Sequence, residues 1–192
     1  VFFDIGANIG LYSIYYAMTQ KGKVYAFEPS VFNLQLLVKN INANKLEKNI
    51  SIITNPITSN NQFSQFLNSN TDEGGALSTF GVDYGHDGKK LISKIEYQTL
   101  GFSLDHLIEN KIIPDIPEMI KIDVDGIEHL ILNGASTTLK NNKCKTIFIE
   151  VSKNFKIQSK EIQNILTDNN FKLQESFQTS KEIGTYNQIW SK

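Results

Sequence analysis

The stretch that decides the fold lies near the start of the chain and reads Asp4-Ile5-Gly6-Ala7-Asn8-Ile9-Gly10. It follows an apolar run at Val1–Asp4 that predicts a buried strand, and it precedes Leu11–Thr19, where apolar residues recur at helical spacing. Gly6 permits a tight turn with an unusual φ, and Gly10 lets the helix begin close to the strand. A strand-to-helix junction of this kind is where an α/β sheet binds a nucleotide.

Short apolar runs and amphipathic helical stretches alternate through the first half of the chain. Lys23–Phe27 and Ile50–Thr54 predict strands, and Val31–Asn42 between them predicts a helix. Strands separated by a helix at this interval are parallel and joined by right-handed crossovers. We therefore expect an α/β fold whose central sheet is mostly parallel and carries helices on both faces.

The same alternation returns in the second half. Helices are predicted at Leu104–Glu109, at Ile127–Gly134 with an extension toward Leu139, and at Ser159–Asp168. Strands are predicted at Glu118–Val124, Lys145–Val151, Phe171–Gln178 and Tyr186–Ser191. Only a short loop separates the last two strands, so we expect them to form an antiparallel pair at the sheet edge.

The middle of the chain, from about residue 60 to residue 97, has a different character. It is rich in Asn, Ser, Gly and Asp, and its apolar residues alternate weakly at Gln62–Leu67 and Ile95–Leu100. We expect one or two irregular strands and a long loop, because loops of this length in a compact domain are usually functional or disordered. The segment is interpreted as an insertion near the active site, where Gly74-Gly75 and Ser78 are candidates to contact substrate.

Composition limits the class of protein. A chain of 192 residues with 40% hydrophobic and 20% charged residues predicts one ordered domain over residues 1–192. The net charge of -1 gives no electrostatic reason to expect a nucleic-acid partner. No apolar run is long enough for a membrane span and nothing resembles a signal peptide, which favours a cytoplasmic location. Because the chain opens on Val1 inside a strand pattern, we expect that its N-terminus is truncated.

The basic residues and the cysteine narrow the chemistry further. All 19 basic residues are Lys, so an anionic substrate would be held without the bidentate guanidinium fork of Arg. The single cysteine, Cys144, excludes an intramolecular disulfide and a zinc site built on several cysteines. It precedes a strongly apolar stretch, which predicts a packed thiol.

Polar residues at three predicted strand ends indicate a nucleoside ligand. Glu28 ends the second strand, 22 positions after Gly6, where a carboxylate can accept hydrogen bonds from both ribose hydroxyls. Asp4 is an acceptor at the end of the first strand, suited to an amino or ammonium group. Asn55 follows the third strand, where a contact to adenine would fall. The pattern predicts a nucleoside with a free ribose.

Other nucleotide sites fit the glycine turn less well. A dinucleotide-binding turn has Gly-x-Gly-x-x-Gly, but this chain has Asn8 at the second glycine and Leu11 at the third. A pyrophosphate would lose its close backbone approach at Asn8. A phosphate-binding loop that ends in Gly-Lys-Ser/Thr is absent. The remaining alternative, a strand–helix turn without a ligand, leaves the position of Glu28 unexplained.

Three carboxylates crowd together where a later strand runs into a turn at Gly126. Asp123, Asp125 and Glu128 lie within six residues of one another. Clustered carboxylates raise one another's pKa, so one could act as a general base, or they could hold a divalent cation that activates a hydroxyl. The alternative is that Asp125 or Glu128 caps the following helix. Glu150 ends the next strand and is expected to point toward the same cleft.

Four motifs, in this order, resemble the FkbM-type methyltransferases that use S-adenosylmethionine (SAM). They are Asp4-x-Gly-Ala-Asn-x-Gly10, Phe27-Glu28-Pro29, Ser103-Leu104-Asp105, and the stretch from Ile120 to Glu128 followed by Leu132-Asn133-Gly134-Ala135. The similarity runs from residue 1 to about Val151. The family most often has Glu where this chain has Asp125, whose side chain is shorter by one methylene group.

The resemblance implies a Rossmann-like class I methyltransferase sheet and O-methylation, frequently of sugars, polysaccharide precursors or secondary metabolites. The cofactor-binding residues that we predict are Asp4, Gly6, Ala7, Asn8, Gly10, Glu28 and Asn55. The predicted catalytic residues are Asp123, Asp125 and Glu128, and the predicted partner is a small-molecule or glycan substrate. Two alternatives stay open: an oxidoreductase that uses NAD or a nucleotide sugar, and a SAM-binding module without turnover, which the Asp125 departure would suit.

Overall fold

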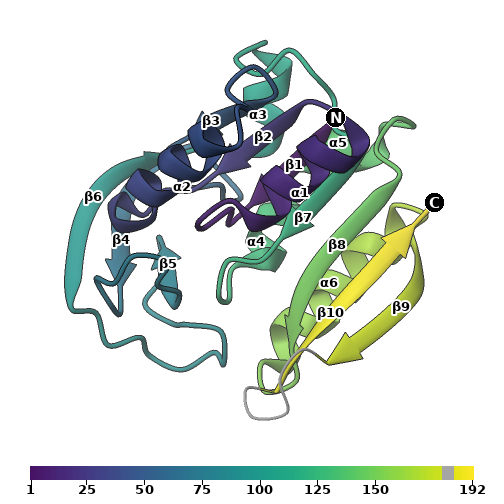
Figure 1. Ribbon diagram of the computed structural model, residues 1–192. Helices are drawn as coiled ribbons and strands as arrows, with labels where there is room; N and C mark the ends of the chain where they lie inside the picture. Colours follow the sequence, from purple (N-terminus) through teal and green to yellow (C-terminus); the bar gives the residue numbers. More distant parts are fainter. Residues whose placement is uncertain (179–183) are drawn as a thin grey trace.

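A computed structural model describes residues 1–178 and 184–192 of the chain. Its central sheet has seven strands, which are β1 (Phe2–Ile5), β2 (Val24–Phe27), β3 (Ile50–Ile53), β7 (Met119–Ile122), β8 (Thr146–Ser152), β9 (Lys172–Gln178) and β10 (Thr185–Ser191). The strand order is β3-β2-β1-β7-β8-β10-β9, with parallel pairing from β3 through to β8 (Figure 1). Strand β10 is antiparallel to both β8 and β9. The predicted parallel sheet with an antiparallel pair at one edge is confirmed, and β9 is the outermost strand.

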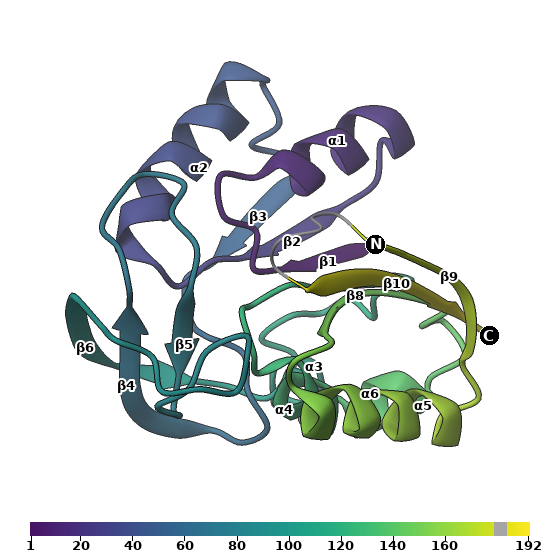
Figure 2. The same cartoon turned by 90° about the horizontal axis from the view of Figure 1, so that it is seen from below.

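In the described part of the chain, six helices cover the sheet in two layers. They are α1 (Leu11–Gln20), α2 (Val31–Ala43), α3 (Leu104–Glu109), α4 (Glu128–Asn133), α5 (Ser136–Lys140) and α6 (Lys156–Asp168). Helices α1 and α2 lie on one side of the sheet and α3 to α6 on the other (Figure 2). None of these helices, in the part of the chain that the structure describes, is long and apolar enough to cross a bilayer.

The helix predicted from Ile127 toward Leu139 is divided into α4 and α5. Gly134 ends α4, and a Cβ atom at this position would lie 2.3 Å from the carbonyl oxygen of Thr58. The chain therefore passes so close to Thr58 that the residue at 134 must lack a side chain. The next helix, α6, begins at Lys156, before its predicted start.

Strands β7 and β8 have two faces of opposite character. Ile122 and Ile149 are fully buried in the core cluster on the side of α4 and α6. Because side chains alternate along a strand, Lys121 and Phe148 face the side of α1, where both contact the Tyr12 ring. Cys144 belongs to the buried core, as predicted, and burial raises the pKa of its thiol to about 11.

The segment from residue 60 to residue 97 contributes most of a second, smaller sheet. Strands β4 (Gln62–Asn68), β5 (Ser78–Phe80) and β6 (Ile95–Gly101) pair antiparallel in the order β5-β4-β6. The prediction of one or two irregular strands was therefore too low. Phe66 and Phe80 are paired across this sheet and belong to the main core, which fixes the sheet against the domain.

One face of the central sheet is partly open. Helices α1 and α2 lie over β1, β2 and β3, whereas no helix among the described residues lies over the same face of β8, β10 and β9 (Figure 2). Three aromatic rings line up there: Phe148 lies 5.7 Å from Tyr12 and 6.3 Å from Phe177 between ring centroids. The Phe177 side chain is 39% exposed. Within the described residues, this face of β8, β10 and β9 is therefore left uncovered by helices.

Asp105 joins α3 to the beginning of α5. Its carboxylate accepts hydrogen bonds from the backbone N–H groups of Thr137 and Thr138, both at 2.8 Å, and from the Thr138 hydroxyl at 2.7 Å. Ser103 caps α3 by accepting from the N–H of His106. A carboxylate at a helix N-terminus satisfies unpaired donors and complements the helix dipole. Asp105 therefore holds the fold together and lies away from the pocket described below.

We expect Asp105→Ala to lower the free energy of unfolding by about 1–3 kcal/mol, because it leaves several backbone and hydroxyl donors without an acceptor. Urea unfolding followed by circular dichroism measures this loss. Glu109→Ala, an exposed change in the same helix, is the matched control. Equal unfolding midpoints for the two variants would contradict the bridging role of Asp105.

Candidate active site

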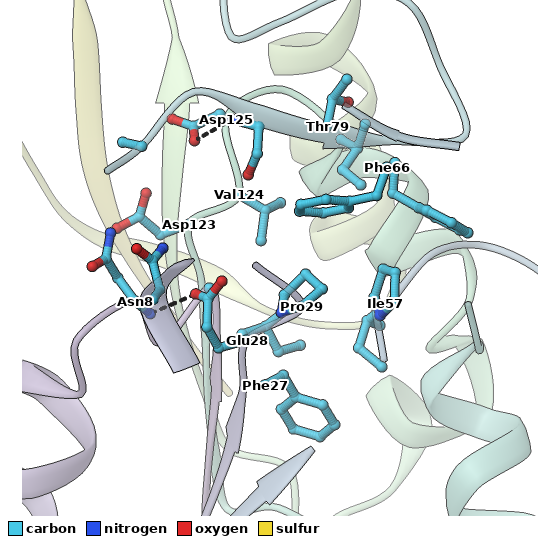
Figure 3. A pocket seen from close by; sticks show the side chains of 18 of the residues that line it. Asn8, Phe27, Glu28, Pro29, Ile57, Phe66, Thr79, Asp123, Val124 and Asp125 are labelled. Atoms are coloured by element: carbon cyan, nitrogen blue, oxygen red, sulfur yellow. Dashed lines mark hydrogen bonds between the residues drawn. The ribbon is translucent and has the colours of Figure 1, made fainter. Parts of the chain in front are cut away.

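A pocket of about 150 Å³ opens at the carboxyl ends of β1, β2 and β7. The chain leaves β1 toward β2 on one side, and β7 lies on the other, so this is the point where the strand order reverses. Gly6 and Asn8 line the pocket after β1, Glu28 after β2, and Asp123 and Asp125 after β7 (Figure 3). The structure thus brings together residues from three of the sequence motifs.

The pocket has a polar and an apolar wall. Glu28, Asp123 and Asp125 are its charged residues, and no basic side chain lines it within the described part of the chain. The apolar wall includes Ile57 and the two aromatic residues of the small sheet, Phe66 and Phe80. Sequence reasoning missed this aromatic wall, since its residues belong to the segment that was expected to be mostly loop.

The glycine turn shapes the pocket through close backbone contacts. Gly6 has φ 80°, and a Cβ atom there would lie 1.9 Å from the carbonyl oxygen of Asp123. Gly10 has φ 90°, and a Cβ atom there would lie 2.6 Å from a Leu37 methyl group. Ala7 and Gly10 are buried and do not line the pocket, so the structure places them within the turn.

Glu28 forms the buried part of the polar wall, with an exposed fraction of 5%. Its carboxylate accepts hydrogen bonds from the N–H of Asn8 at 2.7 Å and the N–H of Ser30 at 2.8 Å. Burial raises the pKa of Glu28, and these hydrogen bonds act against the rise. Each carboxylate oxygen has a further lone pair, so the group can still accept ribose hydroxyls.

Asp4 lies outside the pocket, under α1. Its carboxylate accepts a hydrogen bond from the Ser13 hydroxyl at 2.6 Å and lies 3.4 Å from the ammonium group of Lys121. The same ammonium lies 3.3 Å from Asp123 and donates to the carbonyl oxygen of Gly6 at 3.2 Å. The positively charged group beside Asp4 is thus the side chain of Lys121 and not part of a ligand. The position of Asp4 outside the pocket does not support the predicted contact to the cofactor.

Lys121, which contacts the pocket residues Asp123 and Gly6, was not singled out from the sequence. It is 2% exposed. Burial acts to lower its pKa, but Asp4 and Asp123 outweigh burial and raise it, so the side chain stays charged. The only sequence signal is a single charged residue inside an otherwise apolar strand.

Residues 74–78, which we call the strap, are held at both ends by polar side chains. The Asn8 amide donates to the carbonyl oxygens of Gly74 and Gly75 at 3.2 and 3.1 Å, and the Asn33 amide donates to that of Gly75 at 3.1 Å. At the other end Asp125 accepts from the N–H of Leu77 at 2.7 Å and, more weakly, from that of Ser78. The strap thus connects the glycine turn at residues 6–10 to the turn at residues 123–126, which we call the acidic turn. Its backbone N–H groups occupy the Asp125 carboxylate.

Glu128 lies outside the pocket and is fully buried. It accepts hydrogen bonds from the N–H groups of Val124 and Gly126 at 3.1 and 3.3 Å, and from the Gln158 side chain. Burial raises its pKa to about 8. These contacts indicate that Glu128 stabilises the acidic turn. They do not support the catalytic role that the sequence predicted.

Asn55 and the predicted cation complete the sequence-derived set. Asn55 lines the pocket, and its amide donates to the carbonyl oxygen of Leu100 at 2.9 Å. Among residues 1–178 and 184–192, no group of three or more metal-binding side chains comes together. The divalent cation considered from the sequence therefore has no ligand set in this part of the chain.

The profile of the FkbM methyltransferase domain matches residues 4–173, so the chain belongs to this family. No curated protein matches the chain significantly in sequence. A crystal structure of a methyltransferase FkbM from Methylobacillus flagellatus KT matches all of the chain at 16% identity with a TM-score of 0.65, and the chain covers 43% of that protein.

Two further solved structures are similar over the whole chain. An rRNA methylase from Streptococcus thermophilus has 14% identity and a TM-score of 0.58, with 85% of that protein covered. TrmK from M. capricolum, solved with the cofactor product S-adenosyl-homocysteine, has 15% identity and a TM-score of 0.54, with 61% covered. At these identities the likeness concerns the fold, and it confirms the Rossmann-like methyltransferase sheet.

We expect Asp125→Ala to release the strap. The N–H of Leu77 loses its charged acceptor, so its hydrogen–deuterium exchange should rise about tenfold. Asp72→Ala removes an exposed carboxylate from the same loop and is the matched control. Unchanged exchange at Leu77 in Asp125→Ala would mean that this carboxylate does not hold the strap.

The raised pKa of Glu128 predicts a pH dependence of stability. A carboxyl group whose pKa rises from 4.5 to about 8 on folding contributes stability that is fully present below pH 4.5 and is lost as the pH passes about 8. We expect the free energy of unfolding to fall over this window, and to fall less steeply in Glu128→Gln. Urea unfolding at a series of pH values tests this, with the exposed Glu118→Gln as control. Parallel slopes for Glu128→Gln and wild type would contradict it.

Proposed function

We propose that this member of the FkbM methyltransferase family binds SAM in the pocket and transfers its methyl group to a hydroxyl oxygen of a small-molecule or glycan acceptor. The observation that carries the proposal is the make-up of the pocket at the ends of β1, β2 and β7. One wall is apolar and aromatic, and the other has three carboxylates, Glu28, Asp123 and Asp125, with no basic side chain among the described residues.

The lining fits the chemical groups of SAM. The apolar wall with Phe66 and Phe80 suits an adenine ring, and the buried Glu28 carboxylate suits the ribose hydroxyls. When bound, SAM supplies an electrophilic methyl group on a positively charged sulfonium. Asp123 and Asp125, at the other end of the polar wall, would favour that positive charge.

The same charges argue against the oxidoreductase alternative. A dinucleotide brings a negatively charged pyrophosphate, which this acidic lining would repel. Lys121 does not compensate, because its ammonium lies between Asp4 and Asp123 and not on the pocket surface. Asn8, which replaces a glycine of the dinucleotide turn, points the same way.

The nature of the acceptor comes from the family resemblance. We propose a hydroxyl of a sugar, a polysaccharide precursor or a secondary metabolite, methylated in the cytoplasm. The protein's role in the reaction is to place acceptor and methyl group in line and to remove the acceptor's proton.

We expect Glu28→Ala to weaken the binding of S-adenosyl-homocysteine at least tenfold, because the ribose loses a buried, charged acceptor. Isothermal titration calorimetry measures this, with thermal unfolding as a check on the fold and the exposed Glu47→Ala as control. Unchanged affinity in Glu28→Ala would contradict the ribose assignment.

The same calorimeter separates the rival functions. Titration of wild type with NAD in place of S-adenosyl-homocysteine should give no binding heat. Binding of NAD alone would favour the oxidoreductase. Binding of S-adenosyl-homocysteine without methyl transfer to any hydroxyl compound would favour a module that lacks turnover.

A further inference from the structure

Three polar residues form a row across neighbouring strands beside the pocket. Ile122 pairs with Ile149 in the parallel β7–β8 register, which places Asp123 beside Glu150, and Glu150 pairs directly with Asn187 of β10. Neighbouring strands lie about 4.8 Å apart, so each residue of the row is within reach of the next. Because Asp123 lines the pocket and the strand order continues from β7 through β8 to β10, the row leads from the pocket toward the edge of the sheet.

The row lies on the open face of the sheet. Glu150 alternates with the fully buried Ile149 and therefore faces the same side as Phe148, toward α1. Asn187 is directly paired with Glu150 and shares its face. No helix among the described residues lies over β8 and β10 on this side, so an acceptor could reach the row from there.

Asp123 and Asp125 are already engaged by other groups. The Lys121 ammonium lies 3.3 Å from Asp123, and the strap N–H of Leu77 donates to Asp125 at 2.7 Å. Glu150 differs from both: within residues 1–178 and 184–192 it makes no ion pair, and its side-chain partner is the Thr185 hydroxyl. Of the three carboxylates Asp123, Asp125 and Glu150, Glu150 is therefore the most available to accept a proton.

Asn187 adds a second, independent observation. It is 7% exposed, and its side-chain amide makes no hydrogen bond to any residue in the described part of the chain. The amide keeps a small exposed area, so a ligand with a hydroxyl group would find both a hydrogen-bond donor and an acceptor there. Its position beside Glu150 places the unpaired amide and the available carboxylate at one spot.

We propose that Glu150 accepts the proton of the acceptor hydroxyl and that the Asn187 amide positions the same oxygen. This inference rests on the proposed methyltransferase function and replaces Asp123 and Asp125 as the proton acceptor. The acceptor oxygen bonds to the methyl carbon as the carbon–sulfur bond breaks, the sulfur keeps that electron pair, and the proton passes to a Glu150 carboxylate oxygen.

The charges around Glu150 suit this role. Burial, together with the nearby Asp123 and Asp125 carboxylates, raises its pKa to about 7, while the Thr185 hydroxyl and Lys121 act against the rise. A base is most effective when its pKa lies near the working pH, since it is then both deprotonated and able to hold a proton. Below about pH 7 the group is protonated and cannot accept the proton.

The first test needs no acceptor. Glutamate carboxyl carbons labelled with ¹³C are titrated by NMR, and Glu150→Gln identifies the Glu150 signal. We expect a midpoint near pH 7 for Glu150, and a midpoint near its ordinary value of 4.5 overturns the proposal. Glu175→Gln removes an exposed carboxylate from the same open face, two strands away, and should leave the signal unchanged.

The second test measures transfer of tritiated methyl groups from SAM to a panel of methyl hexopyranosides. In wild type the rate should rise about tenfold per pH unit below pH 7, and Glu150→Gln should lower kcat roughly 100-fold and abolish this rise. Asn187→Ala should mainly raise KM, and Glu175→Gln should behave as wild type. Turnover by Glu150→Gln with the wild-type pH profile overturns the proposal.

Binding of S-adenosyl-homocysteine keeps this inference distinct from the proposed function. Glu150→Gln should bind it within twofold of wild type, because Glu150 is placed at the acceptor and not at the ribose. Failure of wild type to bind it would refute the proposed function itself. Loss of transfer in Glu150→Gln with binding intact supports the base assignment alone, and partial recovery in Glu150→Asp would show that a carboxylate is what the site requires.

Discussion

The arrangement of the pocket depends on the contacts that the buried ammonium group of Lys121 makes. The ammonium lies 3.4 Å from Asp4 on β1 and 3.3 Å from Asp123 after β7, and it donates to the carbonyl oxygen of Gly6. Burying such charges costs several kcal/mol for each ion, and only close pairing offsets that cost. Loss of the ammonium alone would leave the Asp4 carboxylate buried without a cation. The three contacts therefore fix the ends of β1 and β7 relative to each other.

This pairing also sets the charge of the pocket. With its ammonium shared between Asp4 and Asp123, Lys121 offers no positive charge to a ligand, and the polar wall remains acidic. An acidic wall favours a cationic sulfonium and disfavours phosphate groups. The proposed preference for SAM over a dinucleotide therefore rests on where one lysine is placed, and not only on the number of glycines in the turn.

The features that the sequence predicted well are local ones. The alternation of strands and helices, the tight turn at Gly6 and the carboxylates at strand ends depend on residues close together in the chain. Which carboxylates are available depends on distant partners: Lys121 contacts Gly6 across 115 residues, the strap N–H of Leu77 reaches Asp125 across 48, and Gln158 reaches Glu128 across 30. Propensity and spacing carry no information on such pairs, so the burial of Glu128 behind Gln158 and the contacts of Lys121 could not be predicted from the sequence.

The aspartate at position 125, where the family most often has glutamate, also has a structural explanation. Asp125 adopts φ 62°, a left-handed conformation that Asp tolerates better than most residues with a side chain. At the next position Gly126 has φ 129°, and a Cβ atom there would lie 2.6 Å from the carbonyl oxygen of Gly85. In this tight turn the short Asp125 side chain reaches the N–H of Leu77 and holds the strap. The Asp125 carboxylate therefore holds the strap without needing a longer side chain. Because we propose Glu150 as the proton acceptor, aspartate at position 125 is not an argument that turnover has been lost.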